Sequence, residues 1–214
     1  MLVLKTTLDS SLRHWRSYLP PPLAWKDGDQ LPTDINHARL RAKYYGAMCI
    51  VHRPFLKVAL DNKLVAPESS PIPHHKVPRR SDDMPPPSAT QHLPVQEILD
   101  SAKICIESAI YSTIAFDGII NSGSRLVVTN IFGTAHAQFG NMLILSATFR
   151  DPGLHSLVPK WRLEQLFDRT IGLLRSLGQS SETLAQDAKI LGALRDVTLA
   201  GPQEQSASFS SMDG

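Results

Sequence analysis

The spacing of apolar residues predicts a chain of consecutive helices. Near the N-terminus, apolar residues recur at steps of three and four, which places them along one side of a first helix. This stripe consists of Leu4, Leu8, Leu12, Trp15 and Leu19. The prolines at 20–22 are expected to end the helix, because proline has no backbone N–H to donate and crowds the preceding turn.

A second, longer helix is predicted from Thr33 or Asp34, either of which can cap free backbone N–H groups, to about Leu60. Its main stripe is Leu40, Tyr44, Ala47, Val51, Phe55 and Val58, widened by Tyr45, Met48 and Cys49. Apolar residues around so much of the circumference indicate a position in the middle of the domain. Pro54 is expected to kink this helix.

Residues 61–93 differ in composition from their surroundings. They are rich in proline and contain almost no large apolar side chains that could be buried. Such a segment cannot offset the entropy cost of folding, so we predict a disordered insertion.

A third helix is predicted to open with Pro94 in its first turn. One face carries Ile98, Ala102, Cys105, Ala109 and Phe116, and a neighbouring face carries Leu99, Ile106 and Ile110. Two adjacent apolar faces indicate deep burial.

A fourth helix is predicted over roughly 126–149, after a turn at 121–123. Gly133, Ala137 and Gly140 fall on one of its faces, which therefore has little side-chain bulk. Because each glycine inside a helix costs about 1 kcal/mol, we expect this face to permit the close approach of a neighbouring helix. A pocket or a docking helix is the alternative use of the same face.

Two further helices complete the predicted fold. A turn at 151–153 precedes the fifth, which begins near Pro159 and has Gly178 at the position of a C-terminal cap. Its apolar residues are Trp161, Leu163, Leu166, Phe167, Leu174 and Leu177, and those of the sixth are Leu184, Ala188, Leu191 and Leu194. The sixth helix is expected to end near Gly201.

No strand with a period of two is evident, so the predicted class is all-α, an irregular bundle of about six helices. We expect one helical domain over 1–201, interrupted by the insertion at 61–93 and followed by a disordered tail at 202–214.

Composition narrows the function classes. The 214 residues have a formal net charge of only +2, which gives no sign of direct nucleic-acid binding. Two cysteines form neither a disulfide framework nor a metal cluster and suit a reducing compartment. The N-terminus lacks a secretory signal, and the strongest apolar run, 142–145, is too short to span a bilayer. We therefore expect a soluble intracellular chain.

Several local features suggest chemistry, and each has a simpler interpretation. His74-His75, Lys76 and Arg79-Arg80 suggest a metal site or a nuclear import signal, but a flexible proline-rich loop lacks the rigid geometry that a metal needs. We interpret them as a solvated loop in which the basic cluster is compatible with import.

Other candidates lie on predicted helices. His52 and Arg53 could supply an acid–base or anion-binding group, but on a buried helix Arg53 is expected to pair with a carboxylate and fix packing. His136 has no cysteine or acidic residue at the spacing of a nucleophile or metal pair, and Cys105 is expected to be an inert buried thiol. No phosphate-binding glycine loop, nucleophile elbow or HExxH pair is present. We therefore assign no catalytic, cofactor-binding or metal-binding residues and expect no enzyme; a helical enzyme would require a polar pocket with perturbed titratable groups.

Two combinations of residues occur together in the N-terminal part. The first is Leu12-Arg13-His14-Trp15, then Tyr18-Leu19-Pro20 and Leu23-Ala24-Trp25. The second is Leu40-Arg41-Ala42-Lys43-Tyr44-Tyr45, then His52-Arg53-Pro54-Phe55-Leu56. Together they resemble the middle homology region of fungal binuclear zinc cluster (Zn2Cys6) transcription factors, with its Leu-Pro break, short aromatic segment and long helix ending in Arg-Pro-Phe-Leu. The later helices are compatible with the C-terminal half of that region, so the resemblance covers about 1–200.

This resemblance implies a non-enzymatic regulatory domain that acts in the nucleus. The family's DNA-binding module holds two zinc ions with six cysteines, whereas this chain has two cysteines and cannot build such a cluster. We therefore expect DNA contact only through a module absent from this sequence, no cofactor in this chain, no membrane, and the rest of the factor or other proteins as partners, with room for a small-molecule effector. The alternative is an independent helical protein that binds a partner or small ligand outside transcription. A partial domain would also leave an apolar face without its partner.

Overall fold

The computed structural model describes residues 2–28, 30–61, 94–118, 130–179 and 181–200, and within these ranges it contains helices and no strand. The elements are α1 (Leu2–Ser17), η1 (Pro21–Leu23), α2 (Ile35–Asp61), α3 (Val95–Ile114), α5 (Ile131–Arg150), η2 (His155–Leu157), α6 (Lys160–Gly178) and α7 (Glu182–Leu199). The predicted all-α class is confirmed. The turn at 121–123, most of the predicted insertion and the tail at 202–214 lie outside the described residues.

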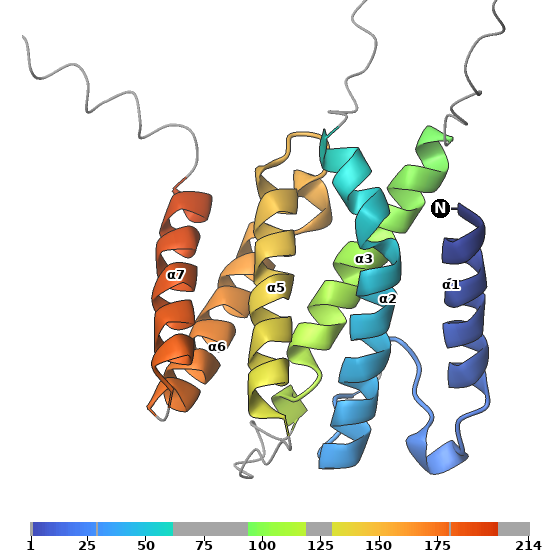
Figure 1. Ribbon diagram of the computed structural model, residues 1–214, viewed down its shortest axis with the longest axis horizontal. Coiled ribbons are helices and arrows are strands. Elements are labelled where there is room, and N and C mark those ends of the chain that lie inside the picture. Colours follow the sequence, from blue (N-terminus) through green and yellow to red (C-terminus); the bar gives the residue numbers. More distant parts are fainter. Residues whose placement is uncertain (1, 29, 62–93, 119–129, 180, 201–214) are drawn as a thin grey trace, which may run out of the picture.

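The helices form two closely packed pairs joined by α5. α2 packs along α3, α6 packs along α7, and α5 contacts α3, α6 and α7 (Figure 1). α1 lies at the edge of this array, beside α2. The long helix α2 therefore packs mainly against α1 and α3 in the N-terminal half, whereas its wide apolar surface predicts a position in the middle of the whole domain.

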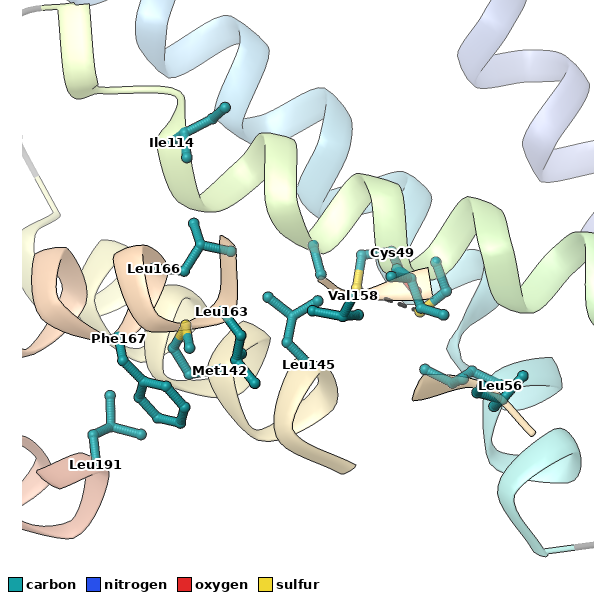
Figure 2. Close-up of a cluster of buried hydrophobic side chains, with 14 of the residues drawn as sticks. Cys49, Leu56, Ile114, Met142, Leu145, Val158, Leu163, Leu166, Phe167 and Leu191 are labelled. Atoms are coloured by element: carbon teal, nitrogen blue, oxygen red, sulfur yellow. Dashed lines mark hydrogen bonds between the residues drawn. The ribbon is translucent and has the colours of Figure 1, made fainter. Parts of the chain in front are cut away.

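One main core runs through both pairs. Met142 and Leu145 of α5 meet Leu163 and Phe167 of α6 and Leu191 of α7, and all five side chains are completely buried (Figure 2). Burying each large apolar side chain stabilises the fold by about 1.5–3 kcal/mol. The predicted stripes of α3, α6 and α7 supply most of this core, although Trp161 was assigned to the α6 stripe and is 64% exposed.

Side-chain caps set where two of the helices begin. Asp34 Oδ1 accepts hydrogen bonds from the backbone N–H groups of Asn36, at 3.0 Å, and His37, at 2.9 Å, which confirms the predicted start of α2. Asn130 Oδ1 accepts from the Gly133 N–H at 2.8 Å. Because a capping residue lies outside the helical conformation, the predicted start of the fourth helix at 126 is wrong, and α5 begins at Ile131.

Pro54 and Gly178 were both expected to disturb the helical geometry, Pro54 as a kink in α2 and Gly178 as the C-terminal cap of α6. α2 continues through Pro54 as a helix, and its last turns bend away from the axis of the rest (Figure 1). Gly178 is not a left-handed cap, because among the described glycines only Gly28 has a positive φ. A Cβ at Gly178 would lie 3.0 Å from the backbone N and Cα of Ala185, so this glycine permits the contact between α6 and α7.

The apolar stripe of α1 is only partly covered. No residue of α1 is buried, and Leu4, Leu8 and Trp15 are 64%, 42% and 42% exposed. Leu12 and Leu19 pack against the aromatic cluster of α2, so only one edge of the predicted stripe faces the bundle. The other edge, with Leu4 and Leu8, is exposed.

Candidate functional site

A groove of about 530 Å³ lies between α2 and α5, and residues at the C-terminal end of α3 and just beyond it also line it. A volume of this size lies within the range of small-ligand pockets. Its lining residues are Arg39, Ala42, Lys43, Gly46, Ala47 and Ile50 of α2, Ser112 and Phe116 at the end of α3, and Asn130, Gly133, Thr134, Ala137 and Gln138 of α5. We call this feature the α2–α5 groove.

The groove exists because both of its walls carry short side chains. Ala42 and Gly46 lie one turn apart on α2, and Gly133 and Ala137 lie one turn apart on α5. A Cβ at Gly46 would meet only Ser112 Oγ, at 3.8 Å, so the opposite wall does not come close.

The predicted close approach of another helix at the small face of α5 is wrong. A Cβ added at Gly140 would meet nothing within 4 Å, and one at Gly133 would meet the side chain of its own capping residue, Asn130. Gly133 and Ala137 line the groove instead, in agreement with the alternative prediction of a pocket on this face. Gly140 is not among the lining residues.

Two basic side chains line the groove. Arg39 and Lys43 lie one turn apart on α2, and none of the described lining residues is acidic. The N-terminus of α5 also opens onto the groove through Asn130 and Gly133, and helix N-termini carry partial positive charge.

Gln138 links the groove to the interior. Its side chain is 2% exposed, and its Oε1 accepts a hydrogen bond from Arg169 Nη1 at 3.3 Å. Arg169 is held in turn by an ion pair with Asp117. This arrangement leaves Gln138 Nε2 as a buried donor for which the described residues provide no acceptor. Buried donors without partners are rare in proteins, because each costs about 1–3 kcal/mol.

His52 pairs with a carboxylate, whereas the sequence analysis assigned that role to Arg53. His52 is 1% exposed, and its Nε2 lies 3.0 Å from Asp9 Oδ1, which joins α1 to α2. Since a carboxylate only accepts, Nε2 carries the hydrogen, and Nδ1 is buried without a described partner. Arg53 is exposed and forms no ion pair with a described residue. His52 therefore fastens two helices together.

The electrostatics of this pair agree with a structural role. Burial lowers the pKa of His52 and outweighs the attraction of Asp9, so the imidazole is kept neutral. Burial raises the pKa of Asp9, but the hydrogen bonds from Arg13 and His52 outweigh burial and lower it. Because the His52 side chain is buried and Asp9 also accepts from Arg13, this pair is poorly placed to transfer protons to a bound molecule.

An aromatic and charged cluster joins the segment after α1 to α2. Arg16 lies over the ring of Trp25, with 4.8 Å between the guanidinium carbon and the ring centroid, and pairs with Asp27 at 2.9 Å. Trp25 Nε1 donates to the Tyr45 hydroxyl at 3.0 Å, and that hydroxyl donates to Asp27. Burial and the neighbouring Asp27 raise the pKa of Tyr45, so this tyrosine stays protonated. Such a closed network holds the chain in place and leaves no reactive group.

The two cysteines meet in the core although they are far apart in sequence. Cys49 Sγ and Cys105 Sγ are 3.7 Å apart and both side chains are buried, with Cys49 of α2 facing α3 (Figure 2). Hydrogen bonding to Cys49 and burial raise the pKa of Cys105, so this sulfur stays a thiol. Cys105 is buried as predicted, but its contact with Cys49 had no signal in the sequence beyond the apolar faces of the two helices.

The remaining candidates do not converge on a site. His136 is on the exposed side of α5, with its Nδ1 3.6 Å from Asp187 Oδ2. The basic and histidine-rich residues at 74–80 lie outside the described residues. No group of three or more metal-ligating side chains occurs in the ranges that the structure covers, and none of the described helices combines the length and apolar character of a membrane-spanning segment. The α2–α5 groove is therefore the candidate site.

Comparisons of the chain with models of protein families, with curated proteins and with solved structures give no match. Sequence reasoning found the small face of α5 but did not identify its opposite wall. The signal for that wall is the series of short residues on α2, where Ala42, Gly46 and Ala47 interrupt the larger side chains.

Proposed function

We propose that this chain is a non-enzymatic regulatory domain of a fungal binuclear zinc cluster transcription factor, in which the α2–α5 groove receives an effector. The observation that carries the regulatory part of the proposal is the groove itself, about 530 Å³ in volume and lined on two helices by short side chains. The titratable pairs described above, such as Asp9 with His52, connect helices and leave no reactive centre.

The transcription part of the proposal is supported by the resemblance of residues 12–25 and 40–56 to the family's middle homology region. These two segments also contact each other: the rings of Trp15 and Tyr44 stack at 6.2 Å, and those of Trp25 and Tyr44 meet edge to face at 5.6 Å. The residues that carry the resemblance therefore share one structural task, the attachment of the N-terminal segment to α2.

The mechanism follows from the position of the groove. α2 and α5 both pack on α3, and an effector between them would contact both helices at once. If the two helices have two relative arrangements, the effector favours the one that it binds better, and ordinary coupling of this kind amounts to about 1–3 kcal/mol. The bias would pass to the DNA-binding module and to other proteins of the transcription machinery in the nucleus.

The proposal is tested by fusing the chain to an unrelated DNA-binding domain and measuring a reporter gene in a fungal host. Ala137→Trp fills the groove, and Ala193→Trp adds the same bulk to an exposed position on α7. We expect reporter output to change several-fold with Ala137→Trp and to stay unchanged with Ala193→Trp, while both variants keep the thermal stability of the parent. Equal output from all three fusions, or no effect of the fused chain on the reporter, would count against a regulatory groove.

A further inference from the structure

The N-terminal half of α1 is attached to the bundle by two ion pairs. Lys5 pairs with Glu97 of α3 at 3.1 Å, and the Asp9 carboxylate contacts His52 of α2 at 3.0 Å. α1 lies at the edge of the array and, unlike the other described α-helices, contains no buried residue (Figure 1). Segments with few buried apolar contacts open separately from the rest of a protein, at a lower free energy. α1 is therefore well placed to open by itself.

The two ends of α1 are held with different strength. Near the C-terminal end, Leu12 packs against the aromatic cluster, and Arg16 lies over the Trp25 ring and pairs with Asp27. In the N-terminal half, Leu4 and Leu8 are instead 64% and 42% exposed. A helical segment of two or three turns is unstable without packing. Opening should therefore begin in the N-terminal half, residues 2–9.

His52 makes this opening sensitive to pH. Its Nε2–H points to Asp9, and its Nδ1 is buried where no described residue accepts a hydrogen bond from it. A second proton on the ring would go to Nδ1 and create a charged, buried N–H without an acceptor, which is unfavourable. When α1 lifts away, water reaches the ring and this penalty disappears. Protonation of His52 therefore favours the open state.

The charged groups around His52 do not remove the penalty. Asp9 attracts a protonated ring, but Lys5 and Arg13, also on α1, repel it. On α3, Glu97 is paired with Lys5. The other ionisable side chains near His52 on α2 and those remaining on α3 are exposed, namely Arg53, Lys57, Asp100, Lys103 and Glu107. The net result is a lowered pKa of His52, with burial as the largest cause.

From this geometry, we propose that the contact between α1 and α2 is a pH-sensitive switch, in which protonation of His52 stabilises a state with the N-terminal half of α1 lifted from α2. Lifting would uncover Phe55, which is 1% exposed and whose ring centroid lies 5.5 Å from Lys5 Nζ. A fall in pH is thus converted into an exposed apolar surface on α2. This switch is separate from the α2–α5 groove and goes beyond the proposed function.

Hydrogen exchange of the purified full chain measures the opening at pH 7.5 and pH 5.5, with the rates corrected for the intrinsic pH dependence of amide exchange. At both pH values, we expect the amides of residues 6–9 to exchange through an opening of lower free energy than the amides of α7. The equilibrium constant for this opening should rise several-fold at pH 5.5, because His52 in the open state titrates near its ordinary value of about 6.5.

Three variants connect the pH dependence to His52. His52→Gln keeps a donor for Asp9 but cannot be protonated, so the rise should shrink to no more than about twofold. The matched control, His14→Gln, removes an exposed histidine from α1 and should leave the rise as in the parent. Asp9→Asn should increase the opening several-fold at both pH values and keep the pH dependence, because His52 Nδ1 is still buried.

Several outcomes would overturn the switch. Exchange of residues 6–9 at the same free energy as α7 would show that α1 does not open separately. An equal rise in the parent and in His52→Gln, or loss of the rise in Asp9→Asn, would assign the pH dependence to another group. The ring signals of His52 and His14 in the parent give a test that needs no variant. A His52 ring that takes up its proton over the same pH range as His14 would also contradict the switch.

Discussion

The two halves of the molecule use small residues in opposite ways. In the C-terminal half, Gly178 lies against α7 so closely that an added Cβ would be 3.0 Å from the Ala185 backbone. On the other side of α5, Gly133 and Ala137 line one wall of an open groove, and Gly46 lines the other. The same residue types therefore give a tight helix contact in one place and an empty surface in the other.

The close contact between α6 and α7 and the open groove between α2 and α5 differ because of how each pair of helices is connected and packed. α6 and α7 are separated by only three residues along the chain, and Leu163, Phe167 and Leu191 fill the space between them and α5. α2 and α5 are not neighbours along the chain. Each packs against α3, and they make few contacts with each other. Small side chains permit close approach, but a connection or a shared core has to enforce it.

The largest expected effect on stability tests the close packing of the C-terminal half. Phe167→Ala should lower the free energy of unfolding by about 3–5 kcal/mol, because the ring is completely buried and its removal leaves a cavity. Leu8→Ala on α1, where the side chain is 42% exposed, should cost no more than about 1 kcal/mol. Urea unfolding of both variants measures the difference. Similar losses would mean that α1 is packed as tightly as the main core.

A second substitution tests the close contact directly. Gly178→Ala should destabilise the fold by about 1 kcal/mol or more, since the added methyl group meets the backbone of α7 and the helices must separate. Thermal and urea unfolding report the change. A neutral or stabilising result would show that α6 and α7 adjust freely, and the contrast between the two halves would disappear.

The matched substitution on α5, Gly140→Ala, should change the free energy of unfolding in the opposite direction. Gly140→Ala meets nothing within 4 Å, so it should stabilise the protein by about 0.5–1 kcal/mol through the better helix propensity of alanine. The same unfolding assay applies. A loss of stability would indicate that a neighbour covers this position in solution.

The smallest expected effect concerns pH and the contact between α1 and α2. Burial lowers the pKa of His52 in the folded protein, whereas in the unfolded chain it titrates near 6.5. As the pH falls through 6.5, the unfolded chain takes up a proton that the folded protein resists, so stability decreases toward acid. Asp9, whose pKa is lowered in the folded state, reinforces this trend at still lower pH.

This prediction is checked by measuring unfolding between pH 7 and pH 5. We expect the parent to lose stability over this range, and His52→Gln, which keeps a donor for Asp9, to lose less. A parent and variant with parallel pH profiles would show that the neutral state of His52 is not what ties stability to pH.

Most of the fold could be predicted from the sequence because the helices have regular apolar spacing and clear ends. Asp34 is a strong cap signal and did start α2, and the apolar faces of α3 and α6 became the core. The start of α5 was misplaced because apolar residues before Asn130 continue the helical period, and spacing alone does not reveal that Asn130 caps the helix.

The candidate site could be predicted only in part. The low-bulk face of α5 is visible in the sequence, but whether it is closed or open depends on which helix lies opposite, and that is decided by tertiary packing. The same limit explains His52. Spacing places it on a buried face of α2, but it does not show that Asp9, 43 residues earlier, is the carboxylate that reaches it.

Sequencing full-length transcripts across the region that encodes Met1 tests most directly whether the chain is part of a zinc cluster transcription factor. If the chain is a regulatory portion of a zinc cluster transcription factor, a longer message should encode a six-cysteine cluster upstream and in the same reading frame. A message that begins at Met1 under its own promoter would contradict that role and would favour an independent helical binding protein that acts outside transcription.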